Sequence, residues 1–313
     1  MASPPAPLPN NSLEENVVMR LFEERKMVRI CAPMVRYSKL AFRMLVRNHG
    51  VDVAYTPMII SDCFARSCIA RDAEFTTHKQ DRPLVVQFAA HNAEDFAAAA
   101  EFVAPYADGV DLNCGCPQRW AISEGYGACL LRHPDKIADM VSMASRRLPF
   151  LPVAIKIRIS EKMEETIELV RRAERMGAAW ITVHGRTPKQ RTQPVNYDAI
   201  RMVKESCSIP VVANGDITTA ETAHRVQVST RVNGVMAARG LLANPAFFEG
   251  DSQICRQDVV KEWINIAVDI GTPFPCLHHH LMFMLESVMC KSGKLCVCVC
   301  VCVCVCVCVC VCV

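Results

Sequence analysis

The sequence predicts a (β/α)8 TIM barrel, and three observations support this prediction. Eight short apolar runs alternate with helical patterns within residues 28–250, which matches the number of units and the size of such a barrel. The runs are apolar on both faces, as parallel strands covered by helices are. Polar residues gather where the runs end, on the side where these barrels carry function. A doubly wound sheet fits less well, because no G-x-G-x-x-G follows the first run.

The eight expected strands follow one another at regular intervals. They cover residues 28–34, 51–58, 83–90, 109–113, 153–159, 180–184, 209–213 and 233–238. The clearest helices between them are expected at residues 39–48, 93–103, 135–147 and 163–176. Gly50 and Gly177 close the first and the last of these helices. The last helix has an apolar stripe at helical spacing, formed by Met163, Ile167, Val170 and Ala173.

Composition agrees with one large soluble α/β domain, since 21% of the residues are charged and 6% are aromatic. The formal net charge of +3 is too small to indicate a nucleic-acid partner by bulk attraction. Residues 1–11 lack the basic start and apolar core of a signal peptide, and no apolar run outside the C-terminal repeat could span a bilayer. We therefore expect a cytoplasmic or nuclear protein, and a mitochondrial location is left open.

The C-terminal residues 296–313 are nothing but alternating Cys and Val, which we interpret as translated simple repeat. This repeat holds about half of the 19 cysteines, and the others are scattered singly, as in a reducing compartment. The predicted boundaries are therefore a lead-in at 1–27, the barrel at 28–250, the truncated start of a C-terminal helical domain at 251–295, and the repeat.

The fourth expected strand leads into the best candidate for a reactive side chain. Apolar and polar residues alternate along it, so Asp111 and Asn113 share one face. Gly115 and Pro117 then end the strand and hold Cys116 on a turn. The thiol of Cys116 is either a reagent or a small buried hydrophobe, and this stretch by itself favours neither.

The turns after the last two strands suggest a phosphate site. Gly215 and Gly240 allow close backbone approach, and Arg239 can donate two hydrogen bonds to phosphate oxygens. Helix N-terminal amides would supply further donors, with a capping box expected at residues 218–221 and a cap followed by proline at residues 244–245. Each turn alone could be ordinary turn chemistry, whereas the pair favours phosphate.

Two further strand ends carry side chains suited to a ligand. Lys156 would emerge in the barrel mouth, where an unpaired ammonium is costly. It is expected to face an anion or an electron-rich atom, such as the N1/O2 edge of a flavin, or to pair with Asp111 or Asp216. His184 could bond a ligand, orient a phosphate or fill the mouth. The two cysteines within residues 114–116 do not predict a metal site, because no second pair at zinc spacing follows.

Six motifs, in their order and spacing, resemble the tRNA-dihydrouridine synthases. They are Ala-Pro-Met at 32–34, Asn-Cys-Gly-Cys-Pro at 113–117, Lys-Ile-Arg at 156–158, His-Gly-Arg-Thr at 184–187, Asn-Gly-Asp-Ile at 214–217 and Ala-Arg-Gly at 238–240. The resemblance covers about residues 28–286, and the set is specific although each motif alone is weak. The segments 118–128 and 241–245 look most like the dihydrouridine synthase 4-like subgroup, which the family associates with positions 20a and 20b of the tRNA D-loop.

The resemblance implies an FMN-dependent reductase of uridine in tRNA. NADPH or NADH would reduce FMN, the flavin N5 hydride would pass to C6 of a uracil, and Cys116 would protonate C5, with Asn113 beside the base. An ordinary thiol is mostly protonated at neutral pH, so it can donate a proton without activation. The target base would have to leave its stack. By the same resemblance the flavin would be held by Pro33, Met34, Gln87, Lys156, His184, Asn214, Gly215, Asp216, Ala238 and Arg239.

The sequence also departs from the family. Ala238 and Ser160 stand where many relatives have glycine, and the repeat replaces most of the helical domain that grips tRNA. Part of an RNA surface is expected from the basic residues Arg36, Lys39, Arg43, Arg186, Lys189 and Arg191. We therefore expect a monomer without metal or membrane that binds FMN, binds tRNA weakly and modifies it poorly. Two alternatives are a flavin barrel that reduces a free pyrimidine or other small molecule, and a non-catalytic truncated product.

Overall fold

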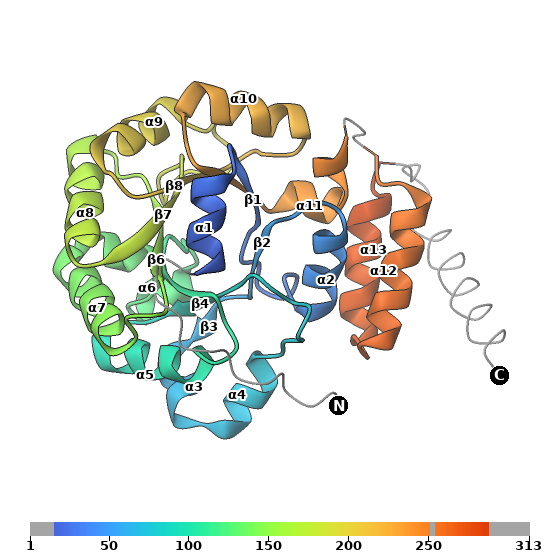
Figure 1. The fold of residues 1–313 in the computed structure, drawn as a ribbon, viewed down its shortest axis with the longest axis horizontal. Helices are drawn as coiled ribbons and strands as arrows, with labels where there is room; N and C mark the ends of the chain where they lie inside the picture. Colours follow the sequence, from blue (N-terminus) through green and yellow to red (C-terminus); the bar gives the residue numbers. More distant parts are fainter. Residues whose placement is uncertain (1–15, 251–253, 288–313) are drawn as a thin grey trace.

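Eight parallel strands close into the barrel that the sequence predicts (Figure 1). The structure is a computed structural model, which describes residues 16–250 and 254–287. The strands are β1 (Val28–Cys31), β2 (Val53–Tyr55), β4 (Leu84–Ala89), β5 (Gly109–Cys114), β6 (Val153–Arg158), β7 (Ala178–His184), β8 (Val211–Asn214) and β9 (Gly234–Ala237). Pairing of β1 with β9 and of β2 with β4 closes the ring. The two-residue β3 (Ile59–Ile60), which was not expected, pairs with β4.

Helices surround the ring of strands, and the four expected from the sequence are confirmed to within one residue at each end. The α-helices are α1 (Val17–Glu24), α2 (Leu40–Asn48), α3 (Ser61–Arg66), α4 (Cys68–Glu74), α5 (Ala93–Val103), α6 (Arg119–Ser123), α7 (Pro134–Arg147), α8 (Met163–Arg175), α9 (Tyr197–Ser206), α10 (Ala220–Thr230), α11 (Arg239–Ala243), α12 (Gln257–Asp269) and α13 (Phe274–Leu285). Two 3-10 helices, η2 (Gly127–Arg132) and η3 (Phe247–Glu249), lie in loops.

The buried face of α8 differs from the predicted stripe in two of its four positions, since Met163 is only half-buried. Val170 and Ala173 are buried as expected, but the other buried positions are Thr166 and Leu169, and Ile167 is only half-buried. The buried face of α8 is therefore rotated about the helix axis relative to the predicted stripe, toward Thr166 and Leu169. A threonine occupies that face because its hydroxyl accepts a hydrogen bond from the backbone of Ser160, with N and Oγ1 2.9 Å apart.

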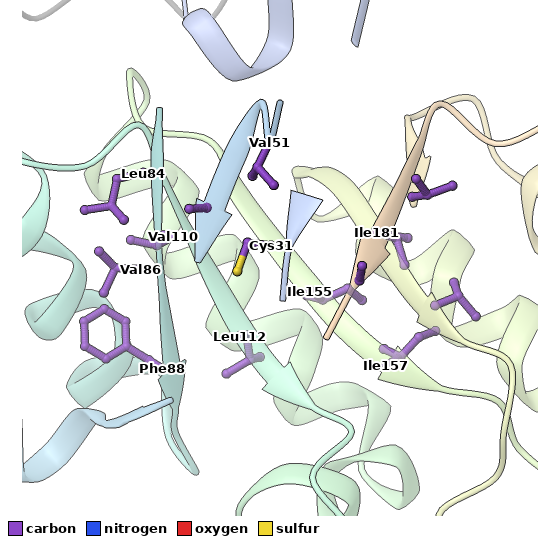
Figure 2. Packing of buried hydrophobic residues seen from close by; sticks show 14 of the residues in the cluster. Cys31, Val51, Leu84, Val86, Phe88, Val110, Leu112, Ile155, Ile157 and Ile181 are labelled. Carbon is purple, nitrogen blue, oxygen red and sulfur yellow. The ribbon is translucent and has the colours of Figure 1, made fainter. Parts of the chain in front are cut away.

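Each strand divides its side chains between two cores, as the alternation of a strand requires. Outward side chains pack under the helices, and Figure 2 shows part of this outer core. It includes Leu84, Val86 and Phe88 of β4, Val110 and Leu112 of β5, and Ile155 and Ile157 of β6. Inward side chains form a smaller core that also includes residues of α1. Its members are Val18, Phe22, Val28, Ile30, Ala32, Val53, Tyr55, Val85, Ala154, Trp180, Val212 and Met236.

Helix α1 lies across the middle of the ring in Figure 1 and packs into the N-terminal end of the barrel. The ring of its Phe22 lies 5.8 Å from that of Trp180. Gly109 leaves the space that the Trp180 indole fills, since a Cβ there would lie 2.8 Å from the ring. Asn16 caps α1 and donates to the carbonyl of Asp108 at 2.9 Å, which ties the helix to the start of β5.

Helices α12 and α13 lie side by side on one flank of the barrel, against α2 and α11 (Figure 1). His280 of α13 is buried between rings, 4.5 Å from both Phe42 of α2 and Trp263 of α12. His49, which ends α2, lies 2.8 Å from Glu262 of α12. Aromatic and polar contacts therefore join these helices to the barrel.

The structure describes only part of the predicted lead-in and none of the repeat. Within the predicted lead-in, residues 1–15 lie outside the described residues, as does the whole repeat at 296–313. Across 16–250 and 254–287, no helix is both long and apolar enough to cross a membrane.

Candidate active site

The inward face of the barrel changes from apolar to polar halfway along the strands. On β4, β6 and β8 the apolar inward residue is followed two positions later by a polar one. The pairs are Val85 and Gln87, Ala154 and Lys156, and Val212 and Asn214. Strand register places the polar members beside Asp111, Asn113, Thr182 and His184 of the neighbouring strands. The polar residues expected at strand ends therefore gather in one mouth, at the carboxyl end of the barrel.

The turn that carries Cys116 is held from both sides. The side chain of Asn113 accepts hydrogen bonds from the backbone N–H groups of Gly115, at 3.1 Å, and Cys116, at 2.9 Å. The carbonyl of Cys116 accepts from the backbone N–H of Ala128 at 3.0 Å. Gly127 has a φ of 61°, and a Cβ there would lie 2.7 Å from the same carbonyl. The half-buried thiol of Cys116 is therefore presented by a turn with little freedom.

Arg158, which ends β6, ties this turn to the next loop. Its Nε donates to the carbonyl of Gly115 at 3.0 Å, and its Nη1 donates to the carbonyl of Thr187 at 3.1 Å. Burial and the nearby charge of Arg186 lower the pKa of Arg158. The sequence indicated Arg158 only as part of a motif, and its bridging contact became visible only with the loops in place.

Lys156 lies in the mouth as expected and bonds an amide. Its Nζ donates to Oδ1 of Asn214 at 3.0 Å, and the Nδ2 of Asn214 donates to the carbonyl of Met236 at 2.8 Å. Within the described residues its ammonium makes no ion pair with Asp111 or Asp216. Burial lowers the pKa of Lys156 to about 8, with a smaller contribution from the charge of Arg158. With a pKa of about 8 the amine is still mostly protonated at neutral pH, and among the described residues no carboxylate bonds it directly.

His184 ends β7 and is neutral at physiological pH. Burial lowers its pKa to about 2, and the neighbouring cations Lys156 and Arg158 add to this effect. Its Nδ1 is buried and has no hydrogen-bond partner in the part of the chain that the structure describes. Gly215, with a φ of 125°, brings the backbone close, since a Cβ there would lie 3.2 Å from the imidazole. A ligand in the mouth could satisfy this ring nitrogen.

Asp216 joins two arginines at the end of β8. Its carboxylate accepts from Nη1 of Arg186 at 3.0 Å and from Nη2 of Arg239 at 3.2 Å, and a second bond joins it to Arg186. The side chain of Arg186 is 4% exposed, whereas that of Arg239 is 74% exposed. Arg239 is therefore the arginine of this pair that can reach a ligand.

Two residues of the expected RNA surface are buried, so that part of the prediction is wrong. Arg186 is occupied by Asp216, and Arg43 is buried in an ion pair with Asp81, 2.6 Å from Nη2 to Oδ2. Lys189 is exposed but bonds Glu161 at 2.9 Å. Arg43 lies on α2 and Arg186 in the loop after β7, and their carboxylate partners are 38 and 30 residues away in the sequence. The exposed members of the expected surface are Arg36, Lys39, Lys189 and Arg191.

The two helix starts proposed for the phosphate site also need correction. Thr219, one residue later than expected, caps α10 by accepting from the N–H of Thr222 at 3.0 Å. Asn244 ends α11 instead of beginning a helix, and its Oδ1 accepts from the N–H of Ala246 at 3.1 Å. The short α11 begins at Arg239 itself. The residue types at 244–245 predicted a helix boundary. They did not show whether a helix begins or ends at that boundary.

The other expected flavin residues lie around the same mouth. Pro33 and Met34 follow β1, and both are half-buried, as is Ala238 after β9. The N–H of Met34 donates to Oγ of Ser38 at 2.9 Å. The carbonyl of Met34 accepts from the backbone N–H groups of Tyr37 and Ser38, both at 3.0 Å, so a tight turn fixes the chain after β1.

Two tyrosines of the mouth escaped the sequence analysis. Tyr126 packs in a small apolar cluster with Cys116, and its hydroxyl donates to Asp62 at 2.8 Å. The hydroxyl of Tyr197 donates to the carbonyl of Gly215 at 2.8 Å. Tyr126 stands between two glycines in a chain that is only 6% aromatic, and this pattern could have indicated it.

No group of three or more His, Cys, Asp or Glu side chains that could hold a metal ion occurs among residues 16–250 and 254–287. The mouth combines a fixed thiol, a half-buried amine, a neutral imidazole and an exposed arginine. Such a set can donate a proton, stabilise an electron-rich ring edge and bind a phosphate.

Comparison with known protein families matches residues 30–295 to the dihydrouridine synthase (Dus) family. A tRNA-dihydrouridine(20a/20b) synthase-like protein of Mus musculus is 52% identical over 278 residues, which are 88% of this chain and 86% of the relative. Its counterpart in Homo sapiens is 50% identical over 88% of this chain and 87% of the relative. The tRNA-dihydrouridine(20a/20b) synthase of Saccharomyces cerevisiae is 39% identical over 92% of this chain and 82% of the relative.

Among solved structures, the old yellow enzyme from Trypanosoma cruzi matches with a TM-score of 0.51 and 11% identity, over 71% of this chain and 86% of that one. Morphinone reductase matches with a TM-score of 0.50 and 12% identity, over 71% of this chain and 84% of that one. At this identity, these likenesses concern the barrel fold alone.

Proposed function

Because this chain belongs to the dihydrouridine synthase family, we propose that it reduces uridine to 5,6-dihydrouridine in tRNA, at positions 20a and 20b. The names of its close relatives supply the substrate, the positions and NAD(P)+ as the oxidised form of the reductant. One structural observation carries the proposal. Cys116 is held on a fixed turn, at the same barrel mouth as Lys156 and His184.

The mouth fits a flavin mononucleotide. His184 offers a buried ring nitrogen that has no partner among the described residues, and Lys156 offers a half-buried ammonium bonded to a neutral amide. Gly215 has a backbone conformation that favours glycine, so the chain can come close to a bound group there. Arg239 has an exposed guanidinium for a phosphate, and the one carboxylate of Asp216 is shared between the two positive charges of Arg186 and Arg239.

The flavin site in this proposal consists of residues that were expected from the sequence, and the structure suggests a role for three of them. Lys156 would face the ring edge that gains electron density, and His184 would donate or accept as a neutral imidazole. Arg239 would bind the phosphate with the backbone of Gly215 and Asp216, because the Asp216 carboxylate is already bonded to arginines. A bound FMN, reduced by NADPH or NADH, would supply the hydride for C6 of the uracil ring.

The chain's own residues would complete the reduction by supplying a proton. The Sγ–H of Cys116 would donate its proton to C5 of the uracil, as general acids do when they are held within reach. Asn113 uses its side-chain oxygen to hold the Cys116 turn, which leaves one amide hydrogen for the base. Cys116 is half-buried, so solvent can return the proton to the sulfur after each turnover.

The test is a reconstitution with the full chain. Purified protein is heated to release its cofactor, which is identified by mass spectrometry, and FMN is expected. The loaded protein is then given NADPH or NADH and tRNA that lacks modifications, and dihydrouridine is mapped by mass spectrometry to positions 20a and 20b. Recovery of FAD would contradict the cofactor. Reduction of free uridine or another pyrimidine with no change in tRNA would contradict the substrate.

A further inference from the structure

Asp111 is an unusual residue for the interior of a barrel. It lies on β5 with 0% of its surface exposed, and it makes no ion pair among the residues that the structure describes. Its Oδ2 accepts a hydrogen bond from Nε2 of Gln87 at 2.7 Å, while its Oδ1 has no hydrogen-bond partner there. Burying a carboxyl group is costly, so a residue of this kind calls for a reason.

Asp111 begins a directed series of hydrogen bonds that ends at the reactive turn. Because the Nε2 of Gln87 donates to Asp111, its Oε1 faces Asn113 and accepts from Nδ2 of Asn113 at 2.8 Å. The Oδ1 of Asn113 is then left to accept from the N–H groups of Gly115 and Cys116. Each amide can donate from one end and accept at the other, so the acceptor at Asp111 sets the direction of both.

Reversal of the series would disrupt the turn. If Gln87 turned its oxygen toward residue 111, its amide nitrogen would face Asn113, which would then have to turn its own nitrogen toward Gly115 and Cys116. Two donors would oppose each other there, and two backbone N–H groups would lose their acceptor.

We infer that Asp111 is a positioning residue, which holds the thiol of Cys116 in place through the Gln87 and Asn113 amides. The inference deepens the proposed function and rests on it for its effect on catalysis. It requires a hydrogen-bond acceptor at position 111 and does not require a negative charge. The oxygen that faces Gln87 accepts in either protonation state, because a proton would sit on Oδ1.

A competing role for Asp111 is to act as a counter-charge for Lys156. The charge of Asp111 favours protonation of Lys156, although burial dominates and the pKa of Lys156 is lowered. The two roles differ in what they require at position 111. A counter-charge is lost in Asp111→Asn and in Asp111→Leu alike, whereas an acceptor is retained in Asp111→Asn and lost only in Asp111→Leu.

The experiment measures the alkylation rate of Cys116 by iodoacetamide in cofactor-free full-length protein, with peptide mass spectrometry to separate it from other thiols. Asp111→Leu should react about tenfold faster, the size expected when one hydrogen bond that holds a closed turn is lost. Asp111→Asn should stay near the wild-type rate. Equal acceleration in both variants, or in neither, would overturn the inference.

Asp108→Leu is the matched control for removal of a buried aspartate. Asp108 is also buried and accepts from the N–H of Leu84 at 2.7 Å, but it lies at the opposite end of β4 and β5. Its removal should leave the rate at Cys116 unchanged. If Asp111→Leu does not fold, Gln87→Leu interrupts the same series, and a folded Gln87→Leu protein with the wild-type rate would overturn the inference.

The loaded enzyme separates this inference from the proposed function. In Asp111→Leu, reduction of the flavin by NADPH should keep its rate, and the step that consumes uridine should slow. Weaker flavin binding with an unchanged alkylation rate of Cys116 would show that Asp111 acts as a counter-charge for Lys156, and would overturn the inference. If wild-type protein does not modify tRNA but the Cys116 rates follow the expected order, the proposed function fails and the positioning role stands.

Discussion

The two ends of the barrel interior are built from the same strands but have opposite properties. At the N-terminal end, Trp180 and Tyr55 are fully buried, and their one shared hydrogen bond, at 2.9 Å, satisfies the indole N–H. At the C-terminal end, His184 and Asp111 each have a buried polar atom without a partner among the described residues. Trp180 and His184 are only four positions apart along β7. The contrast shows that stability and chemistry are divided along each strand, since unsatisfied groups are costly and useful only where a ligand can meet them.

The largest effect is expected at the mouth, from Cys116→Ala. Removal of a proton donor should lower the rate of uridine reduction by about 10² to 10⁴, while reduction of the flavin by NADPH continues. The free energy of unfolding should change little, because the thiol is only half-buried. Single-turnover kinetics and urea unfolding measure the two quantities.

Cys129→Ala is the matched control for this change, because Cys129 is a half-buried thiol on the neighbouring η2. It should keep wild-type kinetics. Normal turnover in Cys116→Ala would show that Cys116 is not the proton donor and only contributes to packing.

The opposite end of the barrel should respond in stability and not in chemistry. Trp180→Ala should lower the free energy of unfolding by about 3 to 5 kcal/mol, because it empties the centre of the inner core. Turnover per folded molecule should be unchanged. Trp120→Ala, at an indole that is 42% exposed, should cost less than about 0.5 kcal/mol in the same urea titration. A large loss of turnover in folded Trp180→Ala would show that the two ends are coupled.

Overfilling the same core should have a smaller effect. In Gly109→Ala the new Cβ would lie 2.8 Å from the Trp180 ring, so the unfolding free energy should fall by about 1 to 3 kcal/mol. Gly250→Ala is the control, because nothing lies within 4 Å of a Cβ there. Equal thermal stability of the two variants would mean that the inner core yields more readily than its packing indicates.

At the mouth, His184 should make the free energy of unfolding depend on pH. The pKa of His184 is lowered to about 2, so below pH 6.5 the unfolded chain binds a proton that the folded chain does not. Stability should therefore fall as the pH drops from 6.5, by at most about 1.4 kcal/mol per pH unit from this residue.

His184→Gln should remove that part of the slope, so that its unfolding free energy falls less between pH 6.5 and 5.5 than that of the wild type. The measurement is urea unfolding of cofactor-free protein at each pH. His224→Gln, at an exposed histidine, should follow the wild-type curve. Parallel curves for all three proteins would contradict the buried, neutral state of His184.

The sequence was sufficient for much of the fold because its signals are local. Alternating apolar runs and helical spacing predicted all eight strands of the ring and the four clearest helices. The polar residues at strand ends could also be predicted to meet, since parallel strands in a barrel end at one rim. Cys116 was identified because Gly115 and Pro117 beside it restrict the chain.

Tertiary structure decided which groups bond one another. Gln87 and Asp111 are 24 residues apart, and Gly115 and Arg158 are 43 apart, so their hydrogen bonds depend on barrel register. The same is true of Arg43 and Arg186. They were predicted to be exposed cations, but in the fold they are buried in ion pairs with Asp81 and Asp216. Periodicity records whether a side chain is buried, because burial depends on the face of its own element. The identity of its partner depends on how distant elements pack, and spacing along one segment carries no information about that.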